Sequence, residues 1–188
     1  MTLWYRRPET PSTPGPIPTV LPQLHTHPFT AWTESLWVSG VVRTDDRLSD
    51  VLNARDPIRI EQPSIVAHGE PRTARQIPIE AILDPFDFEV VMGRAEPREL
   101  LAAHAVKRIH KVRYPVVVHG RNFEVEGQLH LFAGNAPEFA AHLTSSLFLP
   151  LTEAVVRREG RIVSDHGTDV VLVNRYAVRV IQQLDGLH

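Results

Sequence analysis

The chain has 188 residues, of which 43% are hydrophobic and 22% charged, and it contains no cysteine. This composition is typical of a globular protein, and the length allows one large domain or two small ones with a substantial core. The formal net charge of −2 gives no general attraction to nucleic acid or to anionic membranes. The lack of cysteine excludes disulfides, thiolate metal sites and thiol catalysis, and we expect no cofactor.

No segment of the sequence has the pattern of a membrane span or an export signal. The longest apolar runs, such as residues 115–118 and 147–151, are too short to cross a bilayer. Arg6 and Arg7 are not followed by the apolar stretch of a signal peptide. We therefore expect a cytoplasmic protein.

Residues 1–28 hold seven of the sixteen prolines, a density that disfavours helices and paired strands and favours extended conformations. Apolar side chains such as Trp4, Tyr5 and Ile17 suit an arm that docks on a neighbouring surface. A mobile tail is the alternative interpretation.

Residues 29–93 read as a first β-barrel copy. Gly40 stands in the middle of an alternating strand, where a glycine usually marks a bulge or a sharp bend in a curved sheet. The segment RLSDVLNA predicts a short helix, and the next strand is interrupted at Pro63, which favours an edge position or a bulge there. Two short strands joined at Asp84-Pro85 complete this copy.

Residues 94–114 predict a connector helix. Pro97 suits a first helical turn, and acidic residues come early and basic residues late, which complements the helix dipole. The apolar stripe is formed by Leu101, Ala105, Ile109 and Val112.

Residues 115–188 read as a second, cleaner copy. It has an alternating hairpin up to Gly127, a short helix PEFAAHLTS, a long alternating strand from Phe148, and a final strand pair with a turn at Asn174-Arg175.

The two copies align with nearly fixed offsets. Phe29 and Gly40 correspond to Val116 and Gly127, both 87 residues later. Ile65 corresponds to Val155, and Asp84 to Asn174, both 90 residues later. We therefore predict an internal duplication, and a mainly β (α+β) fold of two tandem small antiparallel barrels joined by a helix.

The second copy resembles the Sm/LSm-type barrel, a relative of the SH3-like folds, in the stretches VVVHGRNFEVEGQL, FLPLTEAVV and VVLVNRYAVRVI. That family binds uridine-rich RNA through two turns. Here a helix replaces one turn, and Asn174-Arg175 stands where the family usually has Arg-Gly. The segment RLSDVLN also resembles an uncharacterised bacterial family, which implies no activity.

The sequence favours a protein that is not an enzyme. It contains no GxSxG, GxxxxGK[ST] or GxGxxG motif, and the arginine pair near the N-terminus lacks the companion motif of PilZ barrels. Ser164-Asp165-His166 has the letters of a catalytic triad, but adjacent residues cannot converge as a triad requires. His25 and His27 could share a metal site only with a third ligand, so we expect no metal.

The best candidate for an anion or nucleic-acid site is a basic cluster at the end of the connector helix and in two turns. Its members are Lys107, Arg108, Lys111, Arg113, Arg121, Asn174 and Arg175. A solvated helix end is the alternative interpretation of this cluster.

Three functions follow as hypotheses. The first is a non-catalytic assembly or regulatory module that binds a protein partner or itself as a homo-oligomer. The second is binding of RNA or another nucleic acid through the basic cluster. The third, an enzyme with a site between the copies, has no local support in the sequence.

Overall fold

The computed structural model describes residues 24–68, 75–76, 80–94, 111–164 and 170–184. The predicted arm up to residue 23 and most of the predicted connector helix, residues 95–110, lie outside this range. The first half contains β1 (His25–Trp32), β2 (Leu36–Thr44), α1 (Leu48–Ala54), β3 (Ile58–Ala67), β4 (Arg75–Gln76), β5 (Glu80–Leu83), η1 (Pro85–Asp87) and β6 (Val90–Gly93). The second half contains β7 (Lys111–His119), β8 (Phe123–Phe132), η3 (Pro137–Phe139), α3 (Ala140–Leu143), β9 (Phe148–Arg158), β10 (Arg161–Ile162), β11 (Val170–Asn174) and β12 (Val180–Gln183).

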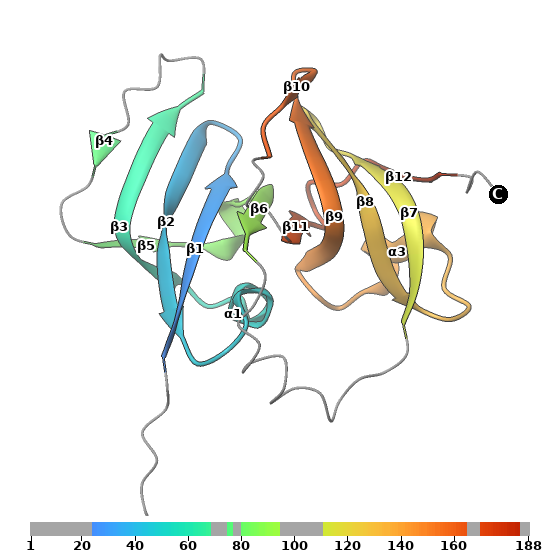
Figure 1. Cartoon of the computed structure of the whole chain (residues 1–188), viewed down its shortest axis with the longest axis horizontal. Coiled ribbons are helices and arrows are strands. Elements are labelled where there is room, and N and C mark those ends of the chain that lie inside the picture. The colour runs from blue at the N-terminus through green and yellow to red at the C-terminus, as the bar shows by residue number, and fades with distance from the viewer. Residues whose placement is uncertain (1–23, 69–74, 77–79, 95–110, 165–169, 185–188) are drawn as a thin grey trace, which may run out of the picture.

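The described strands form one antiparallel sheet of twelve strands, which confirms the prediction of a mainly β fold with short helices. Its order is β12-β7-β8-β9-β11-β6-β1-β2-β3-β4, with β10 beside β9 and β5 beside β3. Figure 1 shows the two halves as curved groups of strands with β6 and β11 between them. Along this order the sheet does not close on itself, and the halves share it through the β6–β11 pair.

The two halves repeat the same strand registers. Phe29 pairs with Gly40 as Val116 pairs with Gly127, which is the predicted offset of 87 residues. The last strands keep the predicted offset of 90, since Val90 and Val180 hold the same place against the first strand of their half.

The third strand departs from the predicted alignment by one residue. Val38 pairs with Ile65, whereas the equivalent Val125 pairs with Val156. The structural equivalent of Ile65 is therefore Val156, and the predicted match to Val155 is wrong. Because side chains alternate along a strand, this one-residue difference decides which face each residue occupies.

A β-bulge in the third strand lies opposite the glycine of the second strand in both halves, and in the first half it falls at Gln62 and Pro63, where the sequence predicts an edge position or a bulge. The pairing register shifts around Gly40 and around Gly127. Opposite them, Gln62 and Glu153 have φ values of 51° and 53°. A Cβ on Gly127 would lie 2.9 Å from the Cβ of Ala154, so the close approach of the strands requires a glycine there.

Three predicted boundaries or connections are wrong. The arm was predicted to end at residue 28, but β1 begins at His25. The connector helix was predicted to reach Tyr114, but β7 begins at Lys111 because the residues from Lys111 to Tyr114 pair with β8. The final two strands do not pair with each other: β11 pairs with β9 and β6, while β12 crosses to β7.

Each half is completed by side chains from the other. The buried core of the second half includes Trp32, Val90 and Met92 of the first half. The core of the first half includes Leu147, Phe148 and Leu172 of the second. A half of this size buries little apolar surface alone, so the exchange of side chains makes the two cores depend on the β6–β11 junction.

Candidate functional site: the junction between the halves and the ends of the sheet

The junction between the halves is an antiparallel pairing of β6 with β11. Val90 lies opposite Val173, Val91 opposite Leu172, Met92 opposite Val171 and Gly93 opposite Val170. The amide of Asn174 continues the ladder by donating to the carbonyl of Glu89 over 2.9 Å. Val90 and Leu172 are fully buried. The junction is therefore a dry continuation of the sheet.

Asn174 joins the turn after β11 to the other half of the chain. Its side chain, 3% exposed, donates from Nδ2 to the carbonyl of Phe88 over 2.8 Å. Its Oδ1 accepts from the amide of Tyr176 over 3.0 Å. The repeat-equivalent Asp84 makes only the second type of bond, accepting from the amide of Phe86 over 2.9 Å. The amide of Asn174 is thus specific to the junction, while its oxygen serves the turn.

Repeat-equivalent turns also meet at the junction. Glu34, in the β1–β2 turn, pairs with Arg121, in the β7–β8 turn, 87 residues later. Phe86 stacks on Tyr176, 90 residues later, with ring centroids 6.4 Å apart and planes 27° apart. Each contact joins the same position of the two halves, so both depend on the way in which the halves are arranged.

A cleft of about 580 Å³ opens between these turns. Its wall combines acidic and basic side chains, among them Glu34, Asp87, Glu89, Arg121 and Arg179, with the ring of Tyr176. One carboxylate oxygen of Glu89 is buried without a hydrogen-bond partner. Because the wall carries charges of both signs, its geometry indicates no preference for an anionic or a cationic ligand.

Two edge strands carry apolar side chains in water: β12 at one end of the sheet, and β5, which lies beside β3 near the other end; we call these two edges the ends of the sheet. Within the described residues, β5 pairs with β3 and β12 pairs with β7, and each leaves its outer edge unpaired. Ile82 on β5 is 69% exposed and Val180 on β12 is 55% exposed. Unpaired strand edges of this kind can pair with another chain. The sequence alone does not identify Ile82 and Val180 as site residues. The repeat alignment could have drawn attention to Ile82, because it equates this residue with Leu172, which is buried.

The predicted basic cluster is not one patch. Lys107 and Arg108 lie outside the described residues. Lys111 and Arg113 are on β7, where Lys111 Nζ lies 5.7 Å from the ring centroid of Phe132 and Arg113 Nη1 lies 3.3 Å from a carboxylate oxygen of Glu153. These two residues share one end of the β7–β8 hairpin.

The other members of the cluster lie elsewhere. Arg121 is in the turn at the opposite end of the hairpin, roughly 20 Å from Arg113 at the rise of a strand, and it pairs with Glu34. Arg175 donates to the carbonyl of Thr144 and, over 2.7 Å, to the hydroxyl of Tyr176. Asn174 is buried. The structure therefore divides the described members between two regions: Lys111 and Arg113 lie at one end of the hairpin, whereas Arg121 and Asn174 line the cleft and Arg175 follows Asn174 in the turn. Each of them has a partner inside the protein.

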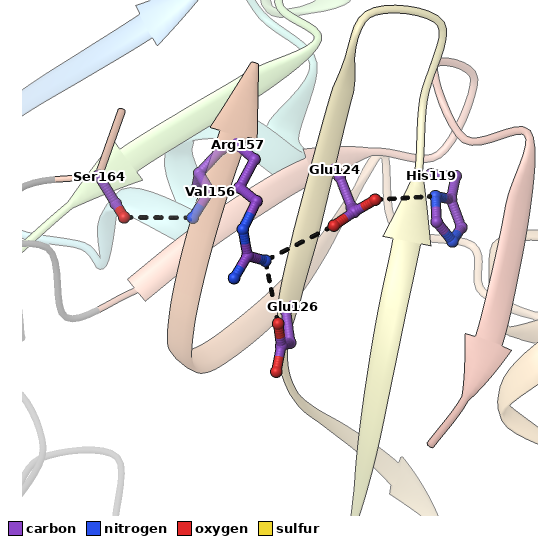
Figure 2. Close-up of polar contacts among 6 residues, drawn as sticks. All are labelled: His119, Glu124, Glu126, Val156, Arg157 and Ser164. Atoms are coloured by element: carbon purple, nitrogen blue, oxygen red, sulfur yellow. Dashed lines mark hydrogen bonds and ion pairs between the residues drawn. The ribbon is translucent and has the colours of Figure 1, made fainter. Parts of the chain in front are cut away.

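The outer face of the second half carries a ladder of ionisable side chains across three strands, drawn in Figure 2. Glu124 lies between His119, at 3.5 Å, and Arg157, at 3.5 Å, and Arg157 also reaches Glu126 at 3.0 Å. Pairs across neighbouring strands of this type stabilise a solvated sheet face.

Ser164 lies at the edge of this ladder and has a structural partner: its Oγ accepts from the amide of Val156 over 3.2 Å. The other two letters of the triad-like sequence, Asp165 and His166, lie outside the described residues. Ser164 thus ties the segment after β10 back to β9.

The two histidines considered as metal ligands lie on β1. His27 is buried, and burial, with the charge of His25, lowers the pKa of His27 below 6.5. Burial also lowers the pKa of His130, with smaller contributions from Arg113 and Lys111. In the part of the chain that the structure describes, no three His, Asp or Glu side chains are grouped so that they could hold a metal ion.

Comparisons with protein-family models, with curated proteins and with solved structures find no match for this chain. No helix among the described residues is long and apolar enough to span a membrane.

Proposed function

We propose that this protein is a non-catalytic assembly module made of two Sm/SH3-like barrels that binds protein through the strand edges at the ends of its sheet. The strand order supports the barrel assignment: β6-β1-β2-β3-β5 in the first half and β12-β7-β8-β9-β11 in the second are the same five-strand arrangement. A bulge in the third strand of each half, opposite the glycine of the second strand, supplies curvature that a small barrel needs.

The observation that carries this proposal is the contrast between the used and unused edges of the sheet. At the junction, edge strands of the two halves pair and bury Val90 and Leu172 completely. At the ends of the sheet, the equivalent positions Val180 and Ile82 are mostly exposed. Addition of a strand to such an edge supplies main-chain hydrogen bonds and covers the apolar side chains.

Binding of nucleic acid through the predicted basic residues is the competing function, and the geometry favours it less. The described members are separated along the hairpin, and Arg113, Arg121 and Arg175 are each engaged by an acidic side chain or a carbonyl. A site for a polyanion needs several unpaired cations that follow one backbone.

Position-specific photo-crosslinking in cells tests the assembly function. A photoreactive amino acid is placed at Ile82 or Val180, and a matched control is placed at Leu143, which is 61% exposed on α3. We expect protein adducts from the two edge positions, with partner peptides that mass spectrometry identifies. Adducts no more abundant at the edges than at Leu143 would overturn the proposed function.

A further inference from the structure

The ends of the sheet are the repeat-equivalents of the two edges that already pair inside the chain. β12 is equivalent to β6, because Val180 lies opposite His119 as Val90 lies opposite Trp32. β5 is equivalent to β11, because each pairs with the third strand of its half in the same register. The chain therefore carries, at its two ends, the two complementary surfaces of its own internal junction.

We propose that a second copy of this chain occupies these edges head to tail, with β12 of one copy pairing antiparallel to β5 of the next. This inference rests on the proposed assembly function and names the partner of that site. The internal junction also predicts the register, since the offset of 90 residues relates Val90 to Val180 and Val170 to Glu80. Between copies, the pairs are Glu80 with Gln183, Ala81 with Gln182, Ile82 with Ile181, and Leu83 with Val180.

The burial of side chains agrees with this register. Leu172, which belongs to the second half, is fully buried in the core of the first half, and Val90 of the first half is fully buried in the core of the second. Their equivalents, Ile82 and Val180, are 69% and 55% exposed in the single chain. Head-to-tail pairing would insert each of them into the adjoining half of a neighbouring copy.

The Glu34–Arg121 pair is compatible with repetition of the junction, whereas Asp84, the equivalent of Asn174, lacks the side-chain donor that binds the carbonyl of Phe88 at the internal junction. Inside the chain, Glu34 of the first half meets Arg121 of the second. At a junction between copies the order is reversed, so that Arg121 of one copy would face Glu34 of the next. The signs are opposite at both kinds of junction, and the aromatic pair of Phe86 and Tyr176 repeats in the same manner.

The junction between copies is more polar than the internal one. Gln182 and Gln183 stand where β6 has Met92 and Gly93, and Glu80 stands where β11 has Val170. We therefore expect an association that dilution reverses. Because the two paired surfaces differ, the contact is heterologous, and it produces a closed ring if the rotation permits and an open chain of copies if it does not.

Disulfide trapping tests both the partner and the register, because the chain has no cysteine of its own. Ala81→Cys and Gln182→Cys are made in separate chains. The proposed register places these residues in a non-hydrogen-bonded pair with Cα atoms about 4.5 Å apart, within the range of a disulfide. We expect a covalent dimer after oxidation of the mixture, and none from either variant alone. Dimers from a single variant would mean that like edges pair and would overturn the head-to-tail arrangement.

Val180→Cys mixed with Ala81→Cys is the register control. The two residues are diagonal neighbours roughly 7–8 Å apart in the proposed pairing, which exceeds the span of a disulfide. Cross-linking as efficient as that of the 81–182 mixture would contradict the register.

Sedimentation velocity of the full chain measures the association without a covalent bond. Ile82→Lys should raise the dissociation constant at least about tenfold, because it would place an ammonium in the core of the neighbouring copy. Leu143→Lys, at a comparably exposed position on α3 and not on either edge strand, should leave the constant unchanged. Equal effects of the two substitutions, or a monomer at all concentrations, would overturn the proposal.

A chain that begins at Leu24 identifies a competing occupant. If this shorter chain associates and the full chain does not, residues 1–23 occupy an edge in place of a second copy, and the proposal is overturned. If these assays detect no self-association, the proposed assembly function can still hold. Photoadducts at the edge positions with a different protein would support that function while excluding a second copy as the partner.

Discussion

Replacement of Asn174 by aspartate should weaken the junction between the halves while leaving the turn after β11 intact. Asn174→Asp keeps an oxygen that can accept from the amide of Tyr176, but it removes the Nδ2 donor to the carbonyl of Phe88. A carboxylate would then face that carbonyl in a site that is 3% exposed. The turn should survive while the link between the halves is lost.

The magnitude follows from two limits. Loss of a buried hydrogen bond that leaves a carbonyl unsatisfied costs about 1–3 kcal/mol, and the buried charge adds to this cost. Because a protonated carboxyl could donate to that carbonyl, the total cost cannot exceed that of protonation, which from an ordinary pKa of about 3.9 is roughly 4 kcal/mol at pH 7. We therefore expect Asn174→Asp to lower the free energy of unfolding by about 2–4 kcal/mol at pH 7.

The same reasoning predicts a pH dependence. Burial raises the pKa of the introduced carboxyl in the folded state above its unfolded value, so the variant is penalised above the unfolded pKa and the penalty falls as the pH decreases. At pH 5 the limit set by protonation is about 1.5 kcal/mol. The difference from the parent protein should therefore shrink between pH 7 and pH 5.

Urea denaturation followed by tryptophan fluorescence measures these differences, with dilute protein so that association does not contribute. Asp84→Asn is the matched control, since it exchanges the same two residue types at the exposed equivalent position and retains an oxygen for the amide of Phe86. Its effect should stay within about 0.5 kcal/mol. Equal effects of the two substitutions, or a penalty for Asn174→Asp that does not change with pH, would refute the reasoning.

Three further outcomes are expected. Gly127→Ala should destabilise the fold by about 1–3 kcal/mol in urea denaturation, because its Cβ would press on Ala154 across the bulge; an unchanged midpoint would contradict this. His27 is buried with a pKa below 6.5, so its neutral form stabilises the fold above that pH and this contribution is lost as the pH falls. His27→Phe should therefore reduce the loss of stability below pH 6.5, and melting curves with the parent's pH slope would count against it. Arg157→Ala, on a partly exposed ladder, should cost less than about 1 kcal/mol, and a penalty that high salt leaves unchanged would argue against ion pairing.

Local pattern in the sequence determined much of the fold. Alternation of apolar residues identified the strands, Gly40 and Pro63 indicated the bulge, and the offsets of 87 and 90 residues identified the repeat. Each of these depends on interactions between neighbouring residues or on a spacing that is preserved in the chain. The change of register by one residue in the third strand was not visible, because two alternating strands align almost equally well at either position.

Only the tertiary structure decided how the strands of the two halves pair with each other. The segments before and after Asn174 read as a strand pair, and those around Asp84 as two joined strands. The turns instead send each following strand back to the first strand of its half and leave one edge for a different partner. The basic cluster was dispersed for the same reason, because Lys111 and Arg113 became part of a strand that carries them far from Arg121. Contacts between residues about 80 positions apart decide which edges pair, which remain unpaired, and whether Leu172 or Ile82 is buried. No local pattern in the sequence records such contacts.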